Sequence, residues 1–367
     1  MKRKLFSMLM IAAVMTSTLV GCGTGKTGDS TASTGSQGSS ETKKVKIAVI
    51  RNLPSDDHTK QFLDGAVQEG KALGYEVDTF ISNGDDAKFQ ELVGQQIGKN
   101  YDGLIISHGK VEYSTDMLKP ALDNGMKVVT FDTAFKDNVI PKGITSTAQD
   151  DYALAQLSLD EIIARSPNKP AKILKLWFGP GVPPLDRREE IYKKYESEGK
   201  IKTVELIGPS TLDDVQGEVS SRVGAVLSKY PAGSIDAIWG SWDELAKGGY
   251  KAMQEAKRND IQLISIDISN QDINLMMEKD SIWKATAAVD PKLIGTVDMR
   301  ILAKKLKGEE TPETFNLEAN LIKAEQLKSD TIMTTLSEVV PGWGKSDAFN
   351  EPWMDELRKG TANNLNF

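Results

Sequence analysis

Short hydrophobic runs alternate with amphipathic segments along most of the chain, beginning near residue 45. Residues 45–50 are rich in β-branched side chains and apolar on both faces, which is typical of a strand buried within a parallel sheet. Phe62, Ala66 and Leu73 then recur at helical spacing, and Gly74 ends the segment. The same reasoning predicts strands at 76–81, 104–107, 127–131, 172–177, 203–207, 235–239, 261–266 and 282–288, and helices at 89–97, 117–122, 152–163, 188–199, 213–229, 243–257 and 291–306.

This alternation predicts the fold class. Repeated strand–helix units form a parallel sheet, and their right-handed crossovers place helices on both faces of it. The units run from residue 45 to residue 131 and start again at residue 152. We therefore expect an α/β protein with two doubly wound parallel-sheet lobes, in keeping with the usual size of about 150 residues per domain.

The first 22 residues predict export from the cytoplasm. Three basic residues at 2–4 precede an apolar run at 5–20, which is too short for a membrane span and ends in small residues, as a secretory signal does. The run closes on Gly21-Cys22, which resembles the bacterial lipobox, a signal whose cysteine becomes the lipid-carrying mature N-terminus. The alternative is that Cys22, the only cysteine, is an incidental residue of a discarded signal peptide. Residues 23–43 are rich in Gly, Ser and Thr, and we expect them to form a flexible tether.

The composition argues against several other classes of protein. The net charge is −7 and no basic stripe is interleaved with aromatic residues, so we do not expect nucleic acid as a partner. Beyond the signal, no apolar run approaches the roughly 20 residues of a membrane span. With two histidines, one cysteine, no nucleophile-elbow motif and no metal-ligand spacing, we expect neither an enzyme nor a metal or other cofactor.

Polar side chains follow many of the predicted strands, and ligands bind beyond the carboxyl ends of the strands in an open parallel sheet. Such groups suit a polyol, because each hydroxyl both donates and accepts a hydrogen bond. The alternative for an Asp or Ser after a strand is helix capping. Trp177, Phe178 and Trp242 could stack on a sugar ring or pack in the core or hinge. The polar residues at these positions are Arg51, Asn52, Ser107, His108, Asp132, Thr133, Asp243 and Asp267, with Asp56, Asp57, His58 and Thr59 at the entrance of the first helix.

Several segments, in their order and spacing, resemble the ribose- and galactose-type periplasmic sugar-binding proteins over residues 44–325. The resemblance implies a type I periplasmic binding fold, in which a three-strand hinge joins two lobes that bind a sugar between them. Residues 44–147 with 290–320 would form the first lobe, and 148–289 with 321–340 the second, while the tail at 341–367 lies outside the resemblance. The segments are Ile47-Ala48-Val49-Ile50, Leu63-Asp64-Gly65-Ala66, Leu73-Gly74-Tyr75, Val128-Val129-Thr130-Phe131-Asp132, Asp243-Glu244-Leu245-Ala246, Ile264-Ser265-Ile266-Asp267 and Asp290-Pro291-Lys292-Leu293-Ile294-Gly295.

The resemblance also implies a set of ligand contacts, of which Asp132, Arg188 and Asp267 match the family in residue type. For Arg188 the alternative is a surface salt bridge on its charged helix. Five positions depart from the ribose proteins: His58-Thr59 replaces an aromatic pair, Thr133 an arginine, Trp242 an asparagine and Val289 a glutamine. These departures add apolar surface and favour a differently decorated pentose, a hexose or a deoxyhexose over ribose itself. The implied contacts are Asn52, Asp56, His58, Thr59, Ser107, Asp132, Thr133, Asp150 or its neighbour Gln149, Arg188, Trp242 and Asp267.

As a function, the resemblance implies capture of a monosaccharide and its delivery to the permease of an ABC importer. We expect an extracytoplasmic monomer, held on the membrane by lipid at Cys22. The alternative is a sensor that presents a sugar or signalling molecule to a membrane kinase. A sugar-responsive repressor would share the two lobes but needs a DNA-binding headpiece, where this chain has a signal and a tether.

Overall fold

The computed structural model describes residues 44–364. The predicted signal, the lipid site at Cys22 and the tether lie outside these residues. Within the described part of the chain, none of the helices combines the length and hydrophobicity needed to cross a membrane.

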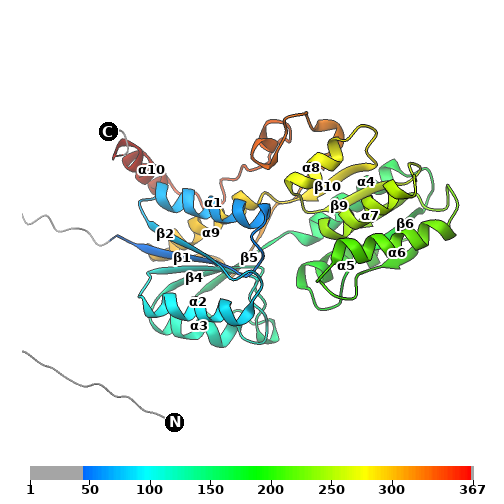
Figure 1. Cartoon of the computed structure of the whole chain (residues 1–367). Helices are drawn as coiled ribbons and strands as arrows, with labels where there is room; N and C mark the ends of the chain where they lie inside the picture. The colour runs from blue at the N-terminus through cyan, green and yellow to red at the C-terminus, as the bar shows by residue number, and fades with distance from the viewer. Residues whose placement is uncertain (1–43, 365–367) are drawn as a thin grey trace, which may run out of the picture. The chain divides into compact units, whose positions relative to one another are not determined.

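A six-stranded sheet with the strand order β11-β5-β4-β3-β1-β2 forms the first lobe, and its neighbouring strands are all parallel (Figure 1). Alternate side chains of a strand point to opposite faces of the sheet, and different helices cover these two faces. Ile47 and Val49 pack with Phe62 of α1, whereas Ala48 and Ile50 pack with Phe89 of α2. The strands are β1 (Lys46–Arg51), β2 (Glu76–Ile81), β3 (Gly103–Ser107), β4 (Lys127–Phe131), β5 (Ile144–Gln149) and β11 (Thr314–Leu317), and the helices are α1 (Asp57–Ala72), α2 (Asp86–Gly98), α3 (Ser114–Asp123) and α9 (Pro291–Leu306), with a 3-10 turn, η1, at Lys136–Asn138.

The second lobe contains a sheet with the order β12-β10-β9-β8-β6-β7, in which only β12 is antiparallel to its neighbour among the described pairs. Ile173 of β6 packs toward Tyr192 of α5, and Leu174 packs in the cluster that contains Val219 of α6. Helices therefore cover both faces of this sheet too. The strands are β6 (Ala171–Leu176), β7 (Ile201–Ile207), β8 (Ala237–Gly240), β9 (Gln262–Ile266), β10 (Trp283–Ala288) and β12 (Asn320–Lys323), and the helices are α4 (Asp151–Arg165), α5 (Pro183–Ser197), α6 (Val215–Lys229), α7 (Asp243–Glu255) and α8 (Asn270–Met277), with 3-10 turns η2 (Ala324–Gln326) and η3 (Met333–Glu338).

The chain passes between the two sheets at β5–α4, at β10–α9 and at β11–β12. These positions differ slightly from the boundaries predicted from the sequence. The strand β5 continues to Gln149, beyond the expected boundary at 147, and Asn320 already belongs to the second sheet as the first residue of β12.

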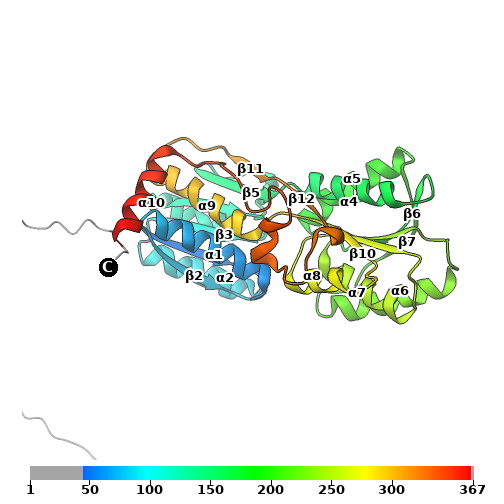
Figure 2. The ribbon, with the colours of Figure 1, turned by 90° about the horizontal axis from the view of Figure 1, so that it is seen from above.

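The C-terminal tail makes a further link between the lobes. Trp343 is buried in the hydrophobic cluster of the second lobe, together with Leu336 of η3. Beyond it, Phe349 packs edge-on against Phe315 of β11, and Met354 of α10 (Pro352–Asn364) is buried at the first lobe. Figure 2 shows α10 beside α1 and α9.

Most predicted elements are present, but α5 begins five residues earlier than the sequence pattern suggested. Its first turn contains Pro183 and Pro184. A proline is well accommodated there, because the amide hydrogen that it lacks would have no partner within the helix. The early start places Arg187 and Arg188 together in one helical turn. The sequence pattern did not predict α8, α10 or the strands β5, β11 and β12.

Candidate functional site

The ends of β3, β4 and β9 share an unusual backbone conformation. The residue after each strand has a positive φ: 61° at His108, 41° at Asp132 and 72° at Asp267. The left-handed region is uncommon for residues other than glycine, although Asp and His tolerate it better than most. Such positions cluster at functional sites, where the surrounding structure holds them.

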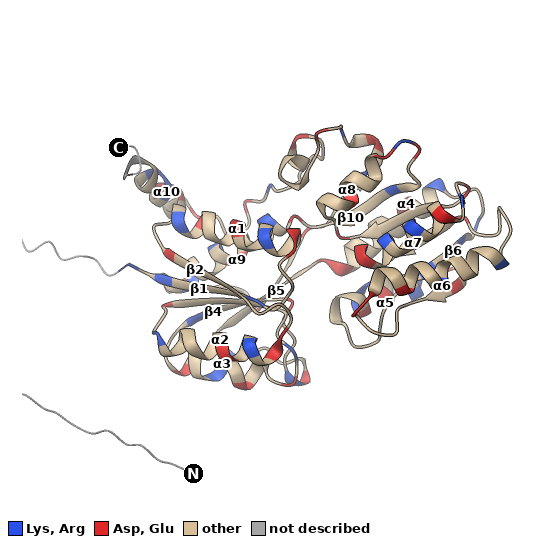
Figure 3. Cartoon of the chain, viewed as in Figure 1, with Lys and Arg blue, Asp and Glu red and all other residues tan. Residues whose placement is uncertain are grey.

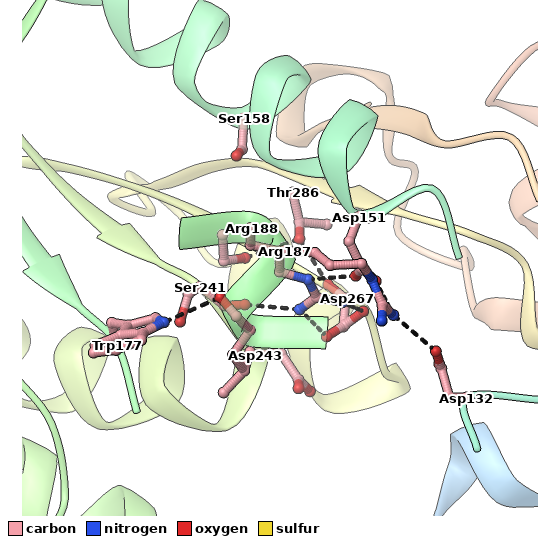
Figure 4. A network of polar contacts seen from close by, with 12 residues as sticks. Asp132, Asp151, Ser158, Trp177, Arg187, Arg188, Ser241, Asp243, Asp267 and Thr286 are labelled. Carbon is pink, nitrogen blue, oxygen red and sulfur yellow. Dashed lines mark hydrogen bonds and ion pairs between the residues drawn. The ribbon is translucent and has the colours of Figure 1, made fainter. Parts of the chain in front are cut away.

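Arg188 is the centre of a buried polar network in the second lobe (Figure 4). Its side chain is 2% exposed. Nη1 and Nη2 donate to the two oxygens of Asp267 at 2.9 and 3.2 Å, Nε donates to Asp151 Oδ1 at 2.8 Å, and Nη1 also donates to the carbonyl of Ser241 at 2.7 Å. Burial lowers the pKa of Arg188, but Asp267 and Asp151 outweigh it and raise the pKa above the usual value. The surface salt bridge considered for Arg188 is therefore wrong, because this arginine is a buried cation.

The neighbouring arginine reaches the first lobe. Arg187 Nη2 donates to Asp132 Oδ1 at 3.0 Å, and its Nη2 and Nε donate to Asp151 Oδ2 at 2.6 and 2.9 Å. Asp151 thus accepts from both arginines, with one oxygen for each. Arg187 and Asp151 are not among the contacts predicted from the sequence, although the Arg187-Arg188 doublet and the Asp at the start of α4 are visible in it.

Burial is the main influence on the carboxyl groups of this network. It raises the pKa of Asp132 to about 7, with a further contribution from the negative charge of Asp151, while Arg187 and Arg188 oppose the shift. Burial likewise raises the pKa of Asp151, against the effect of the two arginines. The positive charges of Arg187 and Arg188 face the carboxyl groups of Asp132, Asp151 and Asp267, which follow strands of both lobes.

In the first lobe, several of the predicted ligand contacts surround Arg51 and not the network of Arg187 and Arg188. This arginine is fully buried, and its guanidinium lies over the ring of Phe62, 4.5 Å from the centroid. It donates to Thr59 Oγ1 at 3.2 Å and to Ser107 Oγ at 3.4 Å, and its Nη2 lies 2.6 Å from His58 Nδ1. Burial lowers the pKa of Arg51 to about 10. The side chains of Thr59 and Ser107 are completely buried, and Arg51 is the hydrogen-bond partner of both hydroxyls inside the lobe.

His58 differs from Thr59 and Ser107, because its ring keeps a second nitrogen for a ligand. Burial lowers its pKa well below the usual value, and the charges of Arg51 and Arg188 add to the effect. The ring is therefore neutral at pH 7, and its Nδ1 accepts the hydrogen bond from Arg51. A neutral ring whose Nδ1 accepts carries its proton on Nε2, which is then a donor.

Two further predicted residues brace the loops of the first lobe. Asn52 is 4% exposed; its amide nitrogen donates to Asp86 Oδ1 at 2.9 Å, and its amide oxygen accepts from Ser82 at 2.5 Å. Thr133 Oγ1 accepts from the backbone nitrogen of Gly109 at 3.3 Å. The bonds of Asn52 join the segments that follow β1 and β2, and the bond of Thr133 joins those that follow β3 and β4.

Asp56 and Asp150 cap helices. Asp56 accepts a 2.7 Å bond from the backbone nitrogen of Thr59 in α1, and Asp150 accepts a 3.0 Å bond from that of Ala153 in α4. This is the capping alternative stated above for acidic residues after strands. Asp56 also lines a cavity of about 320 Å³ between α1 and β2, within the first lobe.

The aromatic candidates differ in their surroundings. Trp242 is partly buried against the hydrophobic cluster of the second lobe, just before α7. Trp177 Nε1 donates to the carbonyl of Leu185 in α5 at 3.1 Å. A side chain at Gly179 would come within 2.4 Å of the Trp177 ring, so a glycine is needed there. Trp177 therefore braces the helix that carries the two arginines.

Three buried polar atoms near these strand ends have no hydrogen-bond partner among the described residues. They are His108 Nδ1 after β3, Gln149 Oε1 at the end of β5 and Ser241 Oγ after β8. Buried polar groups in native proteins are nearly always paired, so each of these atoms needs an explanation. Within residues 44–364, no group of three or more His, Cys, Asp or Glu residues could hold a metal ion.

Residues 47–310 match the family described as periplasmic binding protein domain. The ribose import binding protein RbsB of Salmonella typhimurium is 23% identical over 280 residues, which cover 76% of this chain and 90% of that protein. The solved structure of a sugar ABC transporter from Yersinia enterocolitica is 48% identical, with a TM-score of 0.76, over 87% of this chain and 95% of that chain. A 5-methylthioribose transporter solute binding protein from Thermotoga lettingae, in complex with 5-methylthioribose, is 27% identical, with a TM-score of 0.74, over 86% and 99%. The chain therefore belongs to the periplasmic binding protein domain family, and its two parallel-sheet lobes have the type I fold predicted from the sequence.

Proposed function

We propose that the chain is an extracytoplasmic receptor that captures a monosaccharide and delivers it to the permease of an ABC importer. The observation that carries the proposal is the network at the strand ends, where Asp132 of the first lobe and Asp267 of the second are joined through Arg187 and Arg188. The relatives reported above are import or transport binding proteins, which favours delivery to a transporter over presentation to a kinase.

The chemistry of these groups fits an uncharged polyol. The network is close to neutral, because its two arginines face three carboxyl groups, one of which has a pKa of about 7. A sugar hydroxyl can donate to a carboxylate while it accepts from a guanidinium. The unpaired atoms of His108, Gln149 and Ser241 add both donors and acceptors. We therefore propose that ligand contacts come from Asp132 and Asp267, the latter held in place by Arg188, with His58 and Trp242 beside them.

For the identity of the sugar, we propose a pentose or hexose that carries an apolar substituent or lacks a hydroxyl. Thr133 and Trp242 stand where the resemblance to the ribose proteins implies arginine and asparagine. Both changes remove hydrogen-bonding groups from the predicted contact set. The complex of the Thermotoga relative with 5-methylthioribose supports a ligand of this kind, since its methylthio group replaces a hydroxyl.

A thermal-shift screen followed by calorimetry tests the proposal. The panel contains D-ribose, D-xylose, L-fucose, D-allose and 5-methylthioribose. A sugar that binds only the folded protein raises the melting temperature by mass action, and calorimetry then gives its affinity. If no sugar of the panel shifts the melting temperature or gives a measurable heat of binding, the monosaccharide function is wrong.

We further propose that the mature protein is a monomer without enzymatic activity and that it carries lipid on Cys22. The combination of a signal-like run and a lipobox-like end supports the anchor. Two acyl chains hold a protein on a membrane far more firmly than one does. Mass spectrometry of the mature protein checks the claim directly. An unmodified Cys22, or a mature chain that begins elsewhere, would contradict it.

A further inference from the structure

We propose that Arg187 is a specificity-determining ligand contact, which recognises one hydroxyl of the bound sugar together with Asp132. This inference rests on the proposed monosaccharide function and deepens it. Neither the sequence pattern nor the resemblance to the ribose proteins pointed to Arg187. The inference comes from the position of Arg187, which bonds Asp132 of the first lobe from α5 of the second.

The pattern of hydrogen bonds shows how the guanidinium of Arg187 is oriented. Its Nε and Nη2 both donate to Asp151 Oδ2, so the edge of the group that carries these two nitrogens faces Asp151. Nη2 has a second hydrogen, on the edge that it shares with Nη1, and this hydrogen accounts for the bond to Asp132 Oδ1. The hydrogens on that edge are parallel, so Nη1 directs a donor to the same side as the Asp132 carboxylate.

That shared edge is only half used. Among residues 44–364, Nη1 of Arg187 and Oδ2 of Asp132 have no hydrogen-bond partner, whereas every guanidinium nitrogen of Arg188 has one. The exposed fraction of the side chain is 29% for Arg187 and 2% for Arg188. Arg188 is thus enclosed by its partners, while Arg187 keeps a donor beside a free acceptor.

A donor next to an acceptor matches a hydroxyl group. One hydroxyl could accept from Arg187 Nη1 and donate to Asp132 Oδ2, which would satisfy both groups at once. A carboxylate or phosphate of a ligand would fit less well, because Asp132 and Asp151 already lie against this guanidinium. The site therefore selects a neutral sugar with a free hydroxyl at this position.

The two contacts come from different lobes, which gives the hydroxyl a second effect. Asp132 follows β4 of the first sheet, and Arg187 belongs to α5 of the second lobe. A ligand group that touches both residues favours the arrangement in which they meet, because a ligand shifts an equilibrium toward the state that it binds better. A sugar that lacks this hydroxyl would lose the hydrogen bonds to Arg187 and Asp132 and would no longer favour the arrangement in which these residues meet.

The test compares Arg187→Met with the unaltered protein by calorimetry, using D-ribose, 5-methylthioribose and the 2-, 3- and 5-deoxy analogues of ribose. Methionine keeps an unbranched side chain but removes all donors. We expect the affinity for D-ribose, which keeps all of its hydroxyls, to fall roughly 10- to 100-fold, as for a hydrogen bond to a charged group. For one deoxy analogue, the one without the recognised hydroxyl, the same substitution should cost less than about 3-fold.

Two further variants make the result specific. Arg187→Lys keeps the charge but not the paired hydrogens of the fork, so it should lose affinity like Arg187→Met if the fork is what recognises the hydroxyl. Arg222→Met removes an exposed arginine of α6 and should change neither the affinity nor the melting temperature.

The outcomes separate this inference from the function on which it rests. If the unaltered protein binds sugars and Arg187→Met leaves affinity unchanged, the inference is wrong. If the variant weakens every sugar and every deoxy analogue by the same factor, Arg187 only links the lobes, and the inference is wrong again. If the unaltered protein binds neither these compounds nor any other sugar of the thermal-shift panel, the monosaccharide function fails and the role of Arg187 fails with it.

Discussion

Asp57 of α1 accepts two hydrogen bonds from Asn270 at the start of α8, one from the side-chain nitrogen at 2.8 Å and one from the backbone nitrogen at 3.3 Å. Asp57 belongs to the first lobe and Asn270 to the second. Asn270 is itself held by the backbone nitrogen of Met333, which donates to its oxygen at 2.9 Å. The pair therefore joins the lobes at a second point, apart from Arg187 and Asp132.

Replacing Asp57 with alanine should weaken ligand binding more than it weakens folding. Each lobe keeps its own core, but the arrangement in which the lobes meet loses about 1–2 kcal/mol, or roughly 5- to 30-fold in affinity. Calorimetry with the best-bound sugar of the panel measures the change. Asp64→Ala, on the same helix, is the matched control and should bind normally. Equal affinities for Asp57→Ala and the unaltered protein would show that the pair contributes nothing.

Replacing Arg188 should affect folding as well as binding. Arg188→Met leaves the carboxylates of Asp151 and Asp267 without their main buried counter-charge. Breaking such a pair from one side typically costs about 3–5 kcal/mol of the free energy of unfolding. Urea denaturation measures this loss. Arg222→Met, at an exposed ion pair, should leave the unfolding midpoint unchanged, and a similar result for Arg188→Met would contradict the structural role of the network.

Asp298 should make stability fall as the pH rises. This carboxyl group is completely buried in α9, and burial raises its pKa to about 8. The unfolded chain releases the proton near pH 4, whereas the folded protein keeps it until about pH 8, so the folded state binds more protons in this interval. The free energy of unfolding therefore decreases between these two pH values.

Asp298→Asn separates this effect from the other titrating groups. Asparagine can still accept the 2.7 Å hydrogen bond from Thr147 Oγ1 but does not titrate. Between pH 4 and 8 the stability of the variant should fall less steeply than that of the unaltered protein. Denaturation curves at four pH values in this range make the comparison. Parallel pH profiles for the two proteins would rule out the shifted carboxyl group.

Trp343→Ala should show that the tail is part of the fold. The indole is 2% exposed and lies in the hydrophobic cluster of the second lobe. Removing a buried aromatic side chain costs about 3–5 kcal/mol, which thermal or urea unfolding would detect. Leu357→Ala, at a position 41% exposed in α10, serves as the control and should change stability by less than about 0.5 kcal/mol. A Trp343 variant as stable as the control would mean that the tail is an appendage.

The fold was predictable because local patterns determine it. The strand at 127–131 and the helix at 291–306 agree with β4 and α9 at both ends, since continuous apolar runs and a proline at a helix start are local signals. The strand β5, at Ile144–Gln149, was missed because its threonines and glutamine make it polar. The tail was missed because its buried Trp343 and Met354 are separated by turns without a helical or strand period.

The site was predictable only in part, because the sequence shows where a side chain begins and not what it meets. The order of strands and polar residues identified Asp132 and Asp267 as candidates, and the resemblance to the ribose-type proteins added Arg188. It could not show that the hydroxyls of Thr59 and Ser107 are bonded to Arg51, or that Asp151 is shared by two arginines. Those partners come from segments far apart in the sequence, and tertiary packing alone brings them together.

The connectivity of the first lobe also constrains how the chain can fold after export. The helix α9 packs against α1, and β11 completes the edge of the first sheet, yet both are synthesised after nearly the whole of the second lobe. The amino-terminal strands must therefore wait for distant partners, and contacts of such long sequence separation form slowly. The second lobe has a contiguous stretch from α4 to β10 and can assemble first. We infer that a newly translocated molecule passes through a stage in which residues 44–149 remain open to proteases and chaperones.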